Sequence, residues 1–144
     1  MYTMYIETMA TAHFPSMSSA REHLKEVLDA AVEGRPVSVT RDRSRVAAVD
    51  ADRLAHFLRG VRPARAELAS EAGGWSLFLT GVPVAATGDS VDEVMDAAVD
   101  ALRDYAEAWV DRLRTAPNHR DSWSPVQLVE LSSDDELKSW LRDE

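Results

Sequence analysis

The sequence predicts an α+β protein in which an N-terminal α/β module precedes a ββαβ domain and an acidic C-terminal helix. Capped helices with apolar stripes alternate with short apolar segments of strand length, and this pattern restarts after a small-residue, charged connector. With 45% hydrophobic residues in a chain of 144, a core can be buried. The predicted divisions are 1–62 for the N-terminal module, 63–74 for the linker, 75–131 for the second domain and 132–144 for the C-terminal helix.

A short strand is expected around Met4 to Ile6, and a helix is expected over 19–33. Ser19 and Glu22 fit a capping box, in which each side chain satisfies the other residue's backbone amide. Apolar residues behind this box recur with helical spacing: Ala20, Leu24, Val27, Leu28 and Ala31. Gly34 then predicts the end of the helix.

Two short antiparallel strands follow, predicted by apolar residues that alternate with polar ones: Val37, Val39, Val46 and Ala48. Residues 41–44 between them have turn composition without a glycine. Asp50 can cap a second helix with an apolar side made of Leu54, Phe57 and Leu58. Gly60 and Pro63 predict where this unit closes.

The second domain begins with a nearly continuous apolar run over 75–80, which suits a strand, and a second strand is expected around 84–87. Ser90 and Glu93 fit another capping box and open a long helix. Its apolar stripe consists of Val91, Val94, Met95, Ala98, Leu102, Tyr105, Trp109 and Leu113.

The last part of the chain is expected to contain a loop over 115–124 and a third strand over 126–131. The final segment, SSDDELKSWLRDE, is typical of a capped, acidic helix.

Charge is divided unevenly along the chain, whose formal net charge is −9. Residues 16–65 hold ten Arg or Lys and seven Asp or Glu, a net of +3, whereas residues 66–144 hold six and 17, a net of −11. This asymmetry suggests a basic end for nucleic acid and an acidic end for a basic partner. Two solvated surfaces of opposite sign would explain it equally well.

Several classes of protein are excluded by composition. The chain has no cysteine, no apolar run of about 18 residues and no signal-like start, so we expect a soluble, cytoplasmic protein without a membrane partner. Four histidines are scattered without metal-ligand spacing: His13, His23, His56 and His119. No metal, cofactor or phosphate-binding glycine loop is expected.

Residues 16–58 resemble the DNA-binding part of the prevent-host-death (Phd/YefM-type) antitoxins. The likeness consists of S-x-A-R-x-x-L over 18–24, a helix closed by Glu33-Gly34, the strand 36–41 and the segment 46–49 before a capped helix. The family often has a glycine in the hairpin turn, where this chain has Asp42-Arg43-Ser44.

The resemblance implies a DNA-binding homodimer on palindromic half-sites, with tetramer formation left open. Arg21 and Arg41 would contact the duplex, Arg43 and Arg45 would extend the same basic edge, and Ser18 or Ser19 would bind phosphate. The expected DNA-binding residues are therefore Ser18, Ser19, Arg21, Arg41, Arg43 and Arg45. The alternative is that these arginines pair on the surface with Glu22, Asp42 and Asp50.

Residues 73–131 resemble a HicB-type antitoxin domain, which has a truncated ribonuclease-H-like fold. The matching positions are Gly74-Trp75 and the segment 86–93, followed by an alanine-rich helix. HicB proteins normally carry their own C-terminal DNA-binding segment, but nothing basic follows here. The N-terminal module would supply the DNA-binding function instead.

A metal-dependent nuclease is the enzyme alternative that this likeness raises. Such chemistry needs several carboxylates around two metal ions, one of them on the first strand, and WSLFLT contains none. Asp96, Asp100 and Asp104 follow i, i+4 spacing opposite the apolar stripe and look like a solvated face. We therefore expect no enzymatic activity.

The acidic half would cover a cognate toxin, which the resemblance implies to be a small, basic, ribonuclease-type protein. The expected apolar anchors are Trp123, Leu131, Leu137, Trp140 and Leu141. The alternative is that the last helix folds back onto its own domain.

The sequence thus predicts a type II antitoxin that neutralises its toxin through the C-terminal half and represses its own operon through the N-terminal half. The second possibility is a stand-alone, DNA-binding autoregulator with a partner- or ligand-sensing C-terminal domain.

Overall fold

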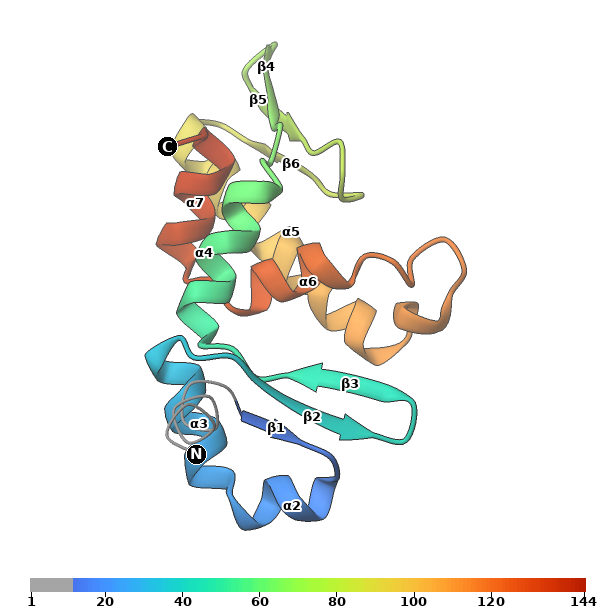
Figure 1. The fold of residues 1–144 in the computed structure, drawn as a ribbon. Helices are drawn as coiled ribbons and strands as arrows, with labels where there is room; N and C mark the ends of the chain where they lie inside the picture. Colours follow the sequence, from blue (N-terminus) through green and yellow to red (C-terminus); the bar gives the residue numbers. More distant parts are fainter. Residues whose placement is uncertain (1–11) are drawn as a thin grey trace. The chain divides into compact units, whose positions relative to one another are not determined.

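The computed structural model describes residues 12–144, so the strand expected at Met4–Ile6 lies outside the described residues. The chain divides into two compact units, Met1–Arg53 and Leu54–Glu144, which are described separately (Figure 1). Unit 1 and unit 2 below refer to these two ranges.

A three-stranded sheet forms the base of unit 1, in the order β1-β2-β3. β1 (Ala12–Phe14) runs parallel to β2 (Val37–Arg41), and β2 pairs antiparallel with β3 (Ser44–Ala47). The predicted arginine-rich hairpin is confirmed, with Asp42 and Arg43 in the turn.

The helix expected over 19–33 is in fact two helices, α2 (Met17–Glu22) and α3 (Leu24–Glu33). The N-cap is Ser16 rather than Ser19, because the Ser16 hydroxyl accepts the amide of Ser19 at 3.1 Å and places Ser19 inside the first turn. His23 departs from helical geometry between the two helices, and its Nδ1 lies 2.9 Å from the Ser19 carbonyl oxygen.

The end of α3 is as predicted. Gly34 adopts the left-handed conformation with φ of 79°, which glycine reaches without steric cost. The small core of unit 1 lies between α3 and the sheet; its buried members are Val27, Ala30, Ala31 and Val37, with Ala12, Phe14, Ala20 and Ala48 packed around them.

Helix α4 (Ala51–Val61) begins in unit 1 and ends in unit 2. Its predicted cap is confirmed: the Arg53 amide donates to the Asp50 carboxylate at 3.0 Å. The expected apolar side is only partly buried, because Leu58 is 5% exposed whereas Phe57 is 60% exposed.

Unit 2 begins with an antiparallel sheet in the order β4-β5-β6. The strands are β4 (Glu67–Glu71), β5 (Gly74–Phe78) and β6 (Ala85–Gly88). β5 and β6 were predicted, but β4 lies in the segment expected to be a connector. Glu and Ala have low strand propensity, and pairing along the whole length of β5 overrides it.

Four further elements follow the sheet: α5 (Val91–Asp111), the short 3₁₀ helix η1 (Leu113–Thr115), α6 (Trp123–Glu130) and α7 (Asp134–Arg142). The third strand expected over 126–131 is wrong, because these residues lie mostly in α6. The observed order is therefore βββααα rather than the ββαβ of a HicB-type domain. Arg103 of α5 donates to the carbonyl oxygens of Val129 and Ser132 and so satisfies the end of α6.

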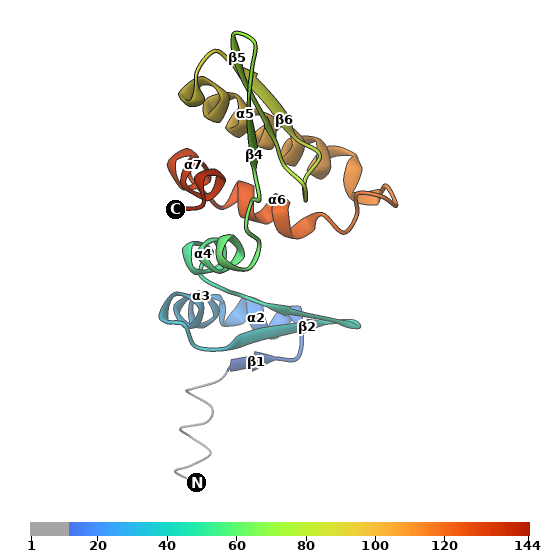
Figure 2. The same cartoon turned by 90° about the horizontal axis from the view of Figure 1, so that it is seen from above.

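Helix α5 packs against β5 and β6 on one side and contacts α6 and α7 (Figure 2). Its buried residues are Val94, Met95, Ala98, Val99, Leu102 and Ala106. Ser90 caps the helix as predicted, accepting the Glu93 amide at 3.1 Å, while the Glu93 carboxylate accepts the amide of Asp89 rather than that of Ser90. The core of unit 2 thus lies between one face of the sheet and the helices.

Candidate functional site

The arginines of the hairpin lie on both of its faces. Arg41 pairs with Ser44 across the strands, and Thr40 pairs with Arg45. Because side chains alternate along a strand and cross-strand partners share a face, Arg41 and Arg45 point to opposite sides of the sheet. The single basic edge expected from the sequence is therefore corrected to two faces joined by the turn.

The face that carries Arg41 is the one covered by helices. Val37 lies on this face of β2 and is buried in the core against α3. Helix α2 also contacts β2. Arg21 lies on α2, so Arg21 and Arg41 both belong to the helix-bearing side. Arg45 instead shares the opposite face with Ser38 and His13.

The turn between the strands places Arg43 at the tip. Asp42 adopts a left-handed conformation with φ of 52°. Asp is one of the few residues other than glycine that visits this region at modest cost, so the turn forms without the glycine that the family often has. All of residues 40–47 are exposed.

The side chains of the predicted DNA-binding arginines have no partner among residues 12–144. Across residues 12–144, no side-chain hydrogen bond or ion pair involves Arg21, Arg41, Arg43 or Arg45. Neighbouring cations are engaged, since Lys25 binds Asp29 and Arg35 binds Glu33, each at 2.7 Å. The expected alternative, pairing of the arginines with Glu22, Asp42 and Asp50, is therefore absent from the described residues.

Other arginines of the basic segment have structural roles that sequence reasoning missed. The Arg53 guanidinium donates to the carbonyl oxygen of Val32 at 2.7 Å, which satisfies the C-terminus of α3. Arg59 donates to the hydroxyl of Ser132 at 2.7 Å, and Arg62 donates to that of Ser124 at 2.8 Å. The net charge of +3 over residues 16–65 thus includes cations that are not free to bind a partner.

The two candidate serines differ in accessibility. Ser18 is exposed in the first turn of α2, whereas Ser19 is half-buried and its backbone amide and carbonyl are both hydrogen-bonded. Ser18 is therefore the better placed of the two to reach a phosphate.

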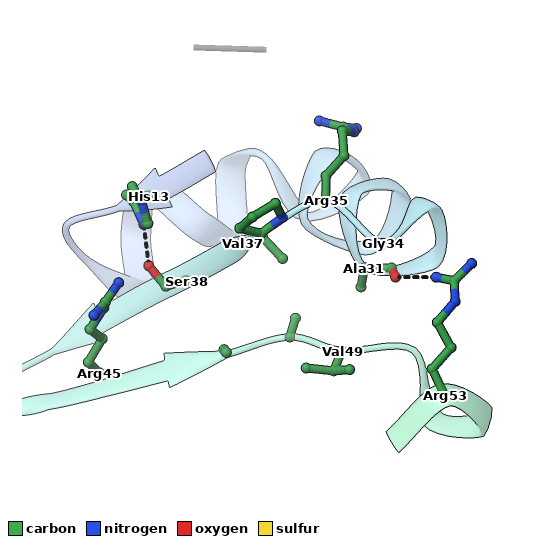
Figure 3. Close-up of a pocket in the computed structure, with 12 residues that line it drawn as sticks. His13, Ala31, Gly34, Arg35, Val37, Ser38, Arg45, Val49 and Arg53 are labelled. Atoms are coloured by element: carbon green, nitrogen blue, oxygen red, sulfur yellow. Dashed lines mark hydrogen bonds between the residues drawn. The ribbon is translucent and has the colours of Figure 1, made fainter. Parts of the chain in front are cut away.

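A cavity of about 570 Å³ opens in unit 1 beside Arg45 (Figure 3). His13 Nδ1 lies 2.5 Å from the Ser38 hydroxyl at one end, and Arg53 donates to the end of α3 at the other. Its lining comprises His13, Ala31, Gly34, Arg35, Pro36, Val37, Ser38, Arg45, Ala47, Ala48, Val49 and Arg53. With three arginines and no carboxylate in that lining, the cavity favours an anion over a cation.

Comparison with known proteins places this geometry in a family. Residues 12–141 match the family model of PHD-like proteins, described as the antitoxin of RelE/RelB toxin–antitoxin systems. The chain belongs to the PHD-like antitoxin family. The match includes residues of both units, so the family likeness is not limited to the N-terminal module.

A solved structure has the same fold. It comes from Syntrophomonas wolfei subsp. wolfei and is described as the antitoxin part of a toxin/antitoxin system. The two chains are 23% identical, the alignment covers 90% of this chain and 94% of the other, and the TM-score is 0.73. No curated protein matches the chain.

Family membership decides between the alternatives left open by the sequence. The protein is an antitoxin of a type II toxin–antitoxin system rather than a stand-alone regulator, and the family is not enzymatic. Within residues 12–144, no group of three or more His, Asp and Glu side chains could hold a metal ion. None of the helices in that range is long and apolar enough to cross a bilayer.

Most of the toxin anchors expected from the sequence are core residues of the antitoxin. Leu137, Trp140 and Leu141 are 0%, 8% and 5% exposed and belong to the core of unit 2. The alternative, in which the last helix folds onto its own domain, is therefore what the structure has. Trp123 is 52% exposed and Leu131 is half-buried, so Trp123 is the most accessible member of the expected set.

Ion pairs and a capping box hold α7 in place. Lys138 binds Asp96 at 2.6 Å, so this carboxylate of the expected solvated face is paired. The cap predicted for the C-terminal helix is confirmed at the N-terminus of α7, with reciprocal hydrogen bonds between Ser133 and Glu136. Hydrogen bonds from Ser133, and to a smaller extent the nearby Arg59, lower the pKa of Glu136 below its ordinary value of 4.5.

An apolar stripe on α3 is exposed rather than buried. Leu24, Leu28 and Val32 are 55%, 55% and 62% exposed, although the sequence placed the first two in one apolar stripe with Val27 and Ala31. Their spacing of four residues puts them on one side of the helix, while Val27 and Ala31 face the sheet. The regular i, i+4, i+8 spacing was the signal that could have identified this second stripe.

Proposed function

We propose that this antitoxin represses its own operon by binding operator DNA through unit 1, and neutralises a basic toxin through unit 2. The observation that carries the DNA half is that four exposed arginines on α2 and the hairpin have no internal partner among the described residues. Arginine that is not engaged in the fold is free to bind phosphate or guanine in bidentate fashion.

The hairpin suits insertion into a groove of DNA. The major groove of B-DNA admits a two-stranded β-ribbon. Arg41 and Arg45 would reach opposite walls from the two faces of such a ribbon, with Arg43 at its tip. Arg21 and the exposed Ser18 on α2 would bind the adjacent phosphate backbone, which fixes register without reading sequence.

A two-fold homodimer would present two hairpins to a palindromic operator. The stripe Leu24, Leu28 and Val32 supports this assembly, because an exposed apolar helix face of a small protein commonly marks an interface. Packing of α3 against α3 of a second copy would bury the stripe.

Unit 2 supplies the charge for toxin binding. Residues 54–144 contain nine Arg or Lys and 17 Asp or Glu, a net charge of −8. Such a surface attracts a basic partner and accelerates association. The resemblance to antitoxins of RNA-cleaving toxins implies a partner of this charge, and Trp123 would provide an apolar anchor.

Binding to DNA of the protein's own promoter, measured by fluorescence anisotropy across a salt series, tests the first half. The Arg21→Ala/Arg41→Ala variant removes two phosphate contacts. The negative slope of log K against log salt should become less steep by about 1.8, because each contact contributes about 0.9. Lys25→Ala is the matched control, since Lys25 is exposed on α3 but paired with Asp29. Its slope should equal that of the wild type.

Wild-type protein that binds its promoter no more tightly than random DNA would refute the repressor half. The toxin half is tested by co-expression with the protein encoded next to the antitoxin gene. A stable complex and restored growth are expected, and the absence of both would contradict neutralisation by direct binding.

A further inference from the structure

One edge of the sheet in unit 2 has no neighbouring strand among the described residues. β4 is the end strand in the order β4-β5-β6, and every one of its five residues is exposed. In an antiparallel pair, every second residue of the outer strand turns its N–H and C=O groups away from the partner. These groups are ready to pair with another strand.

β4 has no lysine, proline or β-bulge, three features that keep other strands away from a sheet edge. Other charged side chains also shield edge strands, and the only charges on β4 are the glutamates at its two ends. β4 reads Glu-Leu-Ala-Ser-Glu, and its pairing with β5 continues without interruption from Glu67 with Phe78 to Glu71 with Gly74. The edge is therefore regular enough to accept a further strand.

The chemistry of the edge is acidic with apolar neighbours. Glu67 and Glu71 lie on the same face as Phe78, which is 48% exposed. This face is opposite to Leu77 and Ala86, which are buried on the side of α5. β4, β5 and β6 contain no Lys or Arg.

A second copy of this chain is a poor occupant. Antiparallel pairing of two β4 strands about Ala69 would place Glu67 directly opposite Glu71 of the other copy, and parallel in-register pairing would place each glutamate beside itself. Like charges directly opposite each other destabilise a sheet. The edge therefore selects a strand that is basic at the positions opposite Glu67 and Glu71.

We infer that β4 binds an extended basic segment of the toxin as a fourth strand of this sheet. The inference rests on the proposed toxin binding by unit 2. The segment would carry Lys or Arg at two positions four residues apart, which spans about 13 Å along a strand. An apolar side chain between them would contact Leu68, which is 40% exposed on the other side of β4.

The first test uses the full chain and a synthetic peptide, Thr-Arg-Val-Thr-Val-Arg-Thr, followed by amide chemical shifts in ¹⁵N NMR spectra. The peptide should shift the amides of 67–71, and the same peptide with glutamate in place of arginine should not. Charge reversal in Glu67→Lys/Glu71→Lys should weaken binding at least tenfold. Glu130→Lys, an exposed acid on α6, is the matched control and should bind like the wild type.

Three results would overturn the inference. The first is no chemical-shift change in β4 at millimolar peptide, and the second is a loss of peptide binding in Glu130→Lys equal to that in the double variant. The third is chemical-shift changes in β4 that depend on protein concentration rather than on peptide concentration. The last result would identify a second copy as the occupant. Far-UV circular dichroism confirms that the double variant is folded.

Co-purification with the adjacent gene's product separates this inference from the proposed function. Wild type that binds the toxin and a double variant that does not would support both. If both proteins bind equally, β4 is not the site but the antitoxin function stands. If the wild type itself does not bind, the proposed function fails and this inference fails with it.

Discussion

The indole Nε1 of Trp140 donates a hydrogen bond to the backbone oxygen of Arg62 at 2.7 Å. This bond ties α7 to the residue that follows α4 within unit 2. Arg59, one turn earlier, binds Ser132 and Glu136 near the start of α7. The C-terminal helix is thus part of the fold of unit 2 and not a tail held in reserve for a partner.

Replacing Trp140 should destabilise unit 2 itself. Trp140→Ala removes a large side chain that is 8% exposed, and such truncations cost about 3 to 5 kcal/mol. Trp123→Ala is the matched control. Trp123 is 52% exposed, so its replacement should change the free energy of unfolding by about 0.5 kcal/mol or less. Urea unfolding followed by far-UV circular dichroism measures both. Equal stability of the two variants would contradict the packing of α7.

Two glycines should respond to alanine in opposite directions. Gly34 has φ of +79°, and a Cβ there would lie 3.3 Å from the Arg53 guanidinium, so Gly34→Ala should cost about 1 kcal/mol. Gly60 lies in α4, and a Cβ added there would meet no atom within 4 Å outside the helix backbone, so Gly60→Ala should stabilise the protein by about 0.5 kcal/mol. Thermal or urea unfolding compares them. Stabilisation by Gly34→Ala would show that α3 does not end at this residue.

The contribution of Glu136 to stability should depend on pH. Its pKa is lowered in the folded protein by hydrogen bonds from Ser133, and also by Arg59, so the ionised carboxylate stabilises the fold above the ordinary value of 4.5. This contribution is lost as the pH falls through the folded pKa. The stability gap between wild type and Glu136→Gln should therefore exist at neutral pH and close in acid. A gap that is constant over that range would contradict the assignment.

Disrupting the stripe on α3 should produce monomers. Leu28→Asp places a charge at the centre of the stripe and should prevent the proposed α3 contact between two copies. Glu26→Ala, an exposed change on the same helix but away from the stripe, should leave the dimer intact. Sedimentation equilibrium reports the mass of each variant. A Leu28→Asp protein that still dimerises would move the interface to another surface.

Local signals in the sequence located many of the elements. Ser90 and Ser133 cap their helices as predicted, and Gly34 ends α3. These features depend on a few neighbouring residues, so the sequence contains the information they need. The hairpin around Arg43 was predicted for the same reason. The opposite orientation of Arg41 and Arg45 follows from strand alternation and was missed because the arginines were considered as one edge.

The errors arose where distant residues decide the structure. The segment 126–131 is short and rich in Val and Leu, which fits a strand or a buried helix equally well. Arg103, more than twenty residues earlier, binds the end of α6 and favours the helix. β4 was missed because its composition is that of a linker, and its pairing with β5 is a tertiary effect. Leu137 and Trp140 could be assigned to the core only once α7 was seen to pack on α5.

The tryptophans of this antitoxin all belong to one of its two units. They are Trp75, Trp109, Trp123 and Trp140, and residues 1–53 contain none. Intrinsic indole fluorescence will therefore report on unit 2 alone, while unit 1 is silent at the same wavelengths. Toxin binding can be read from the protein's own emission, and a dye on the DNA can report unit 1 in the same sample. The division of the chain thus provides two independent optical channels for its two proposed partners.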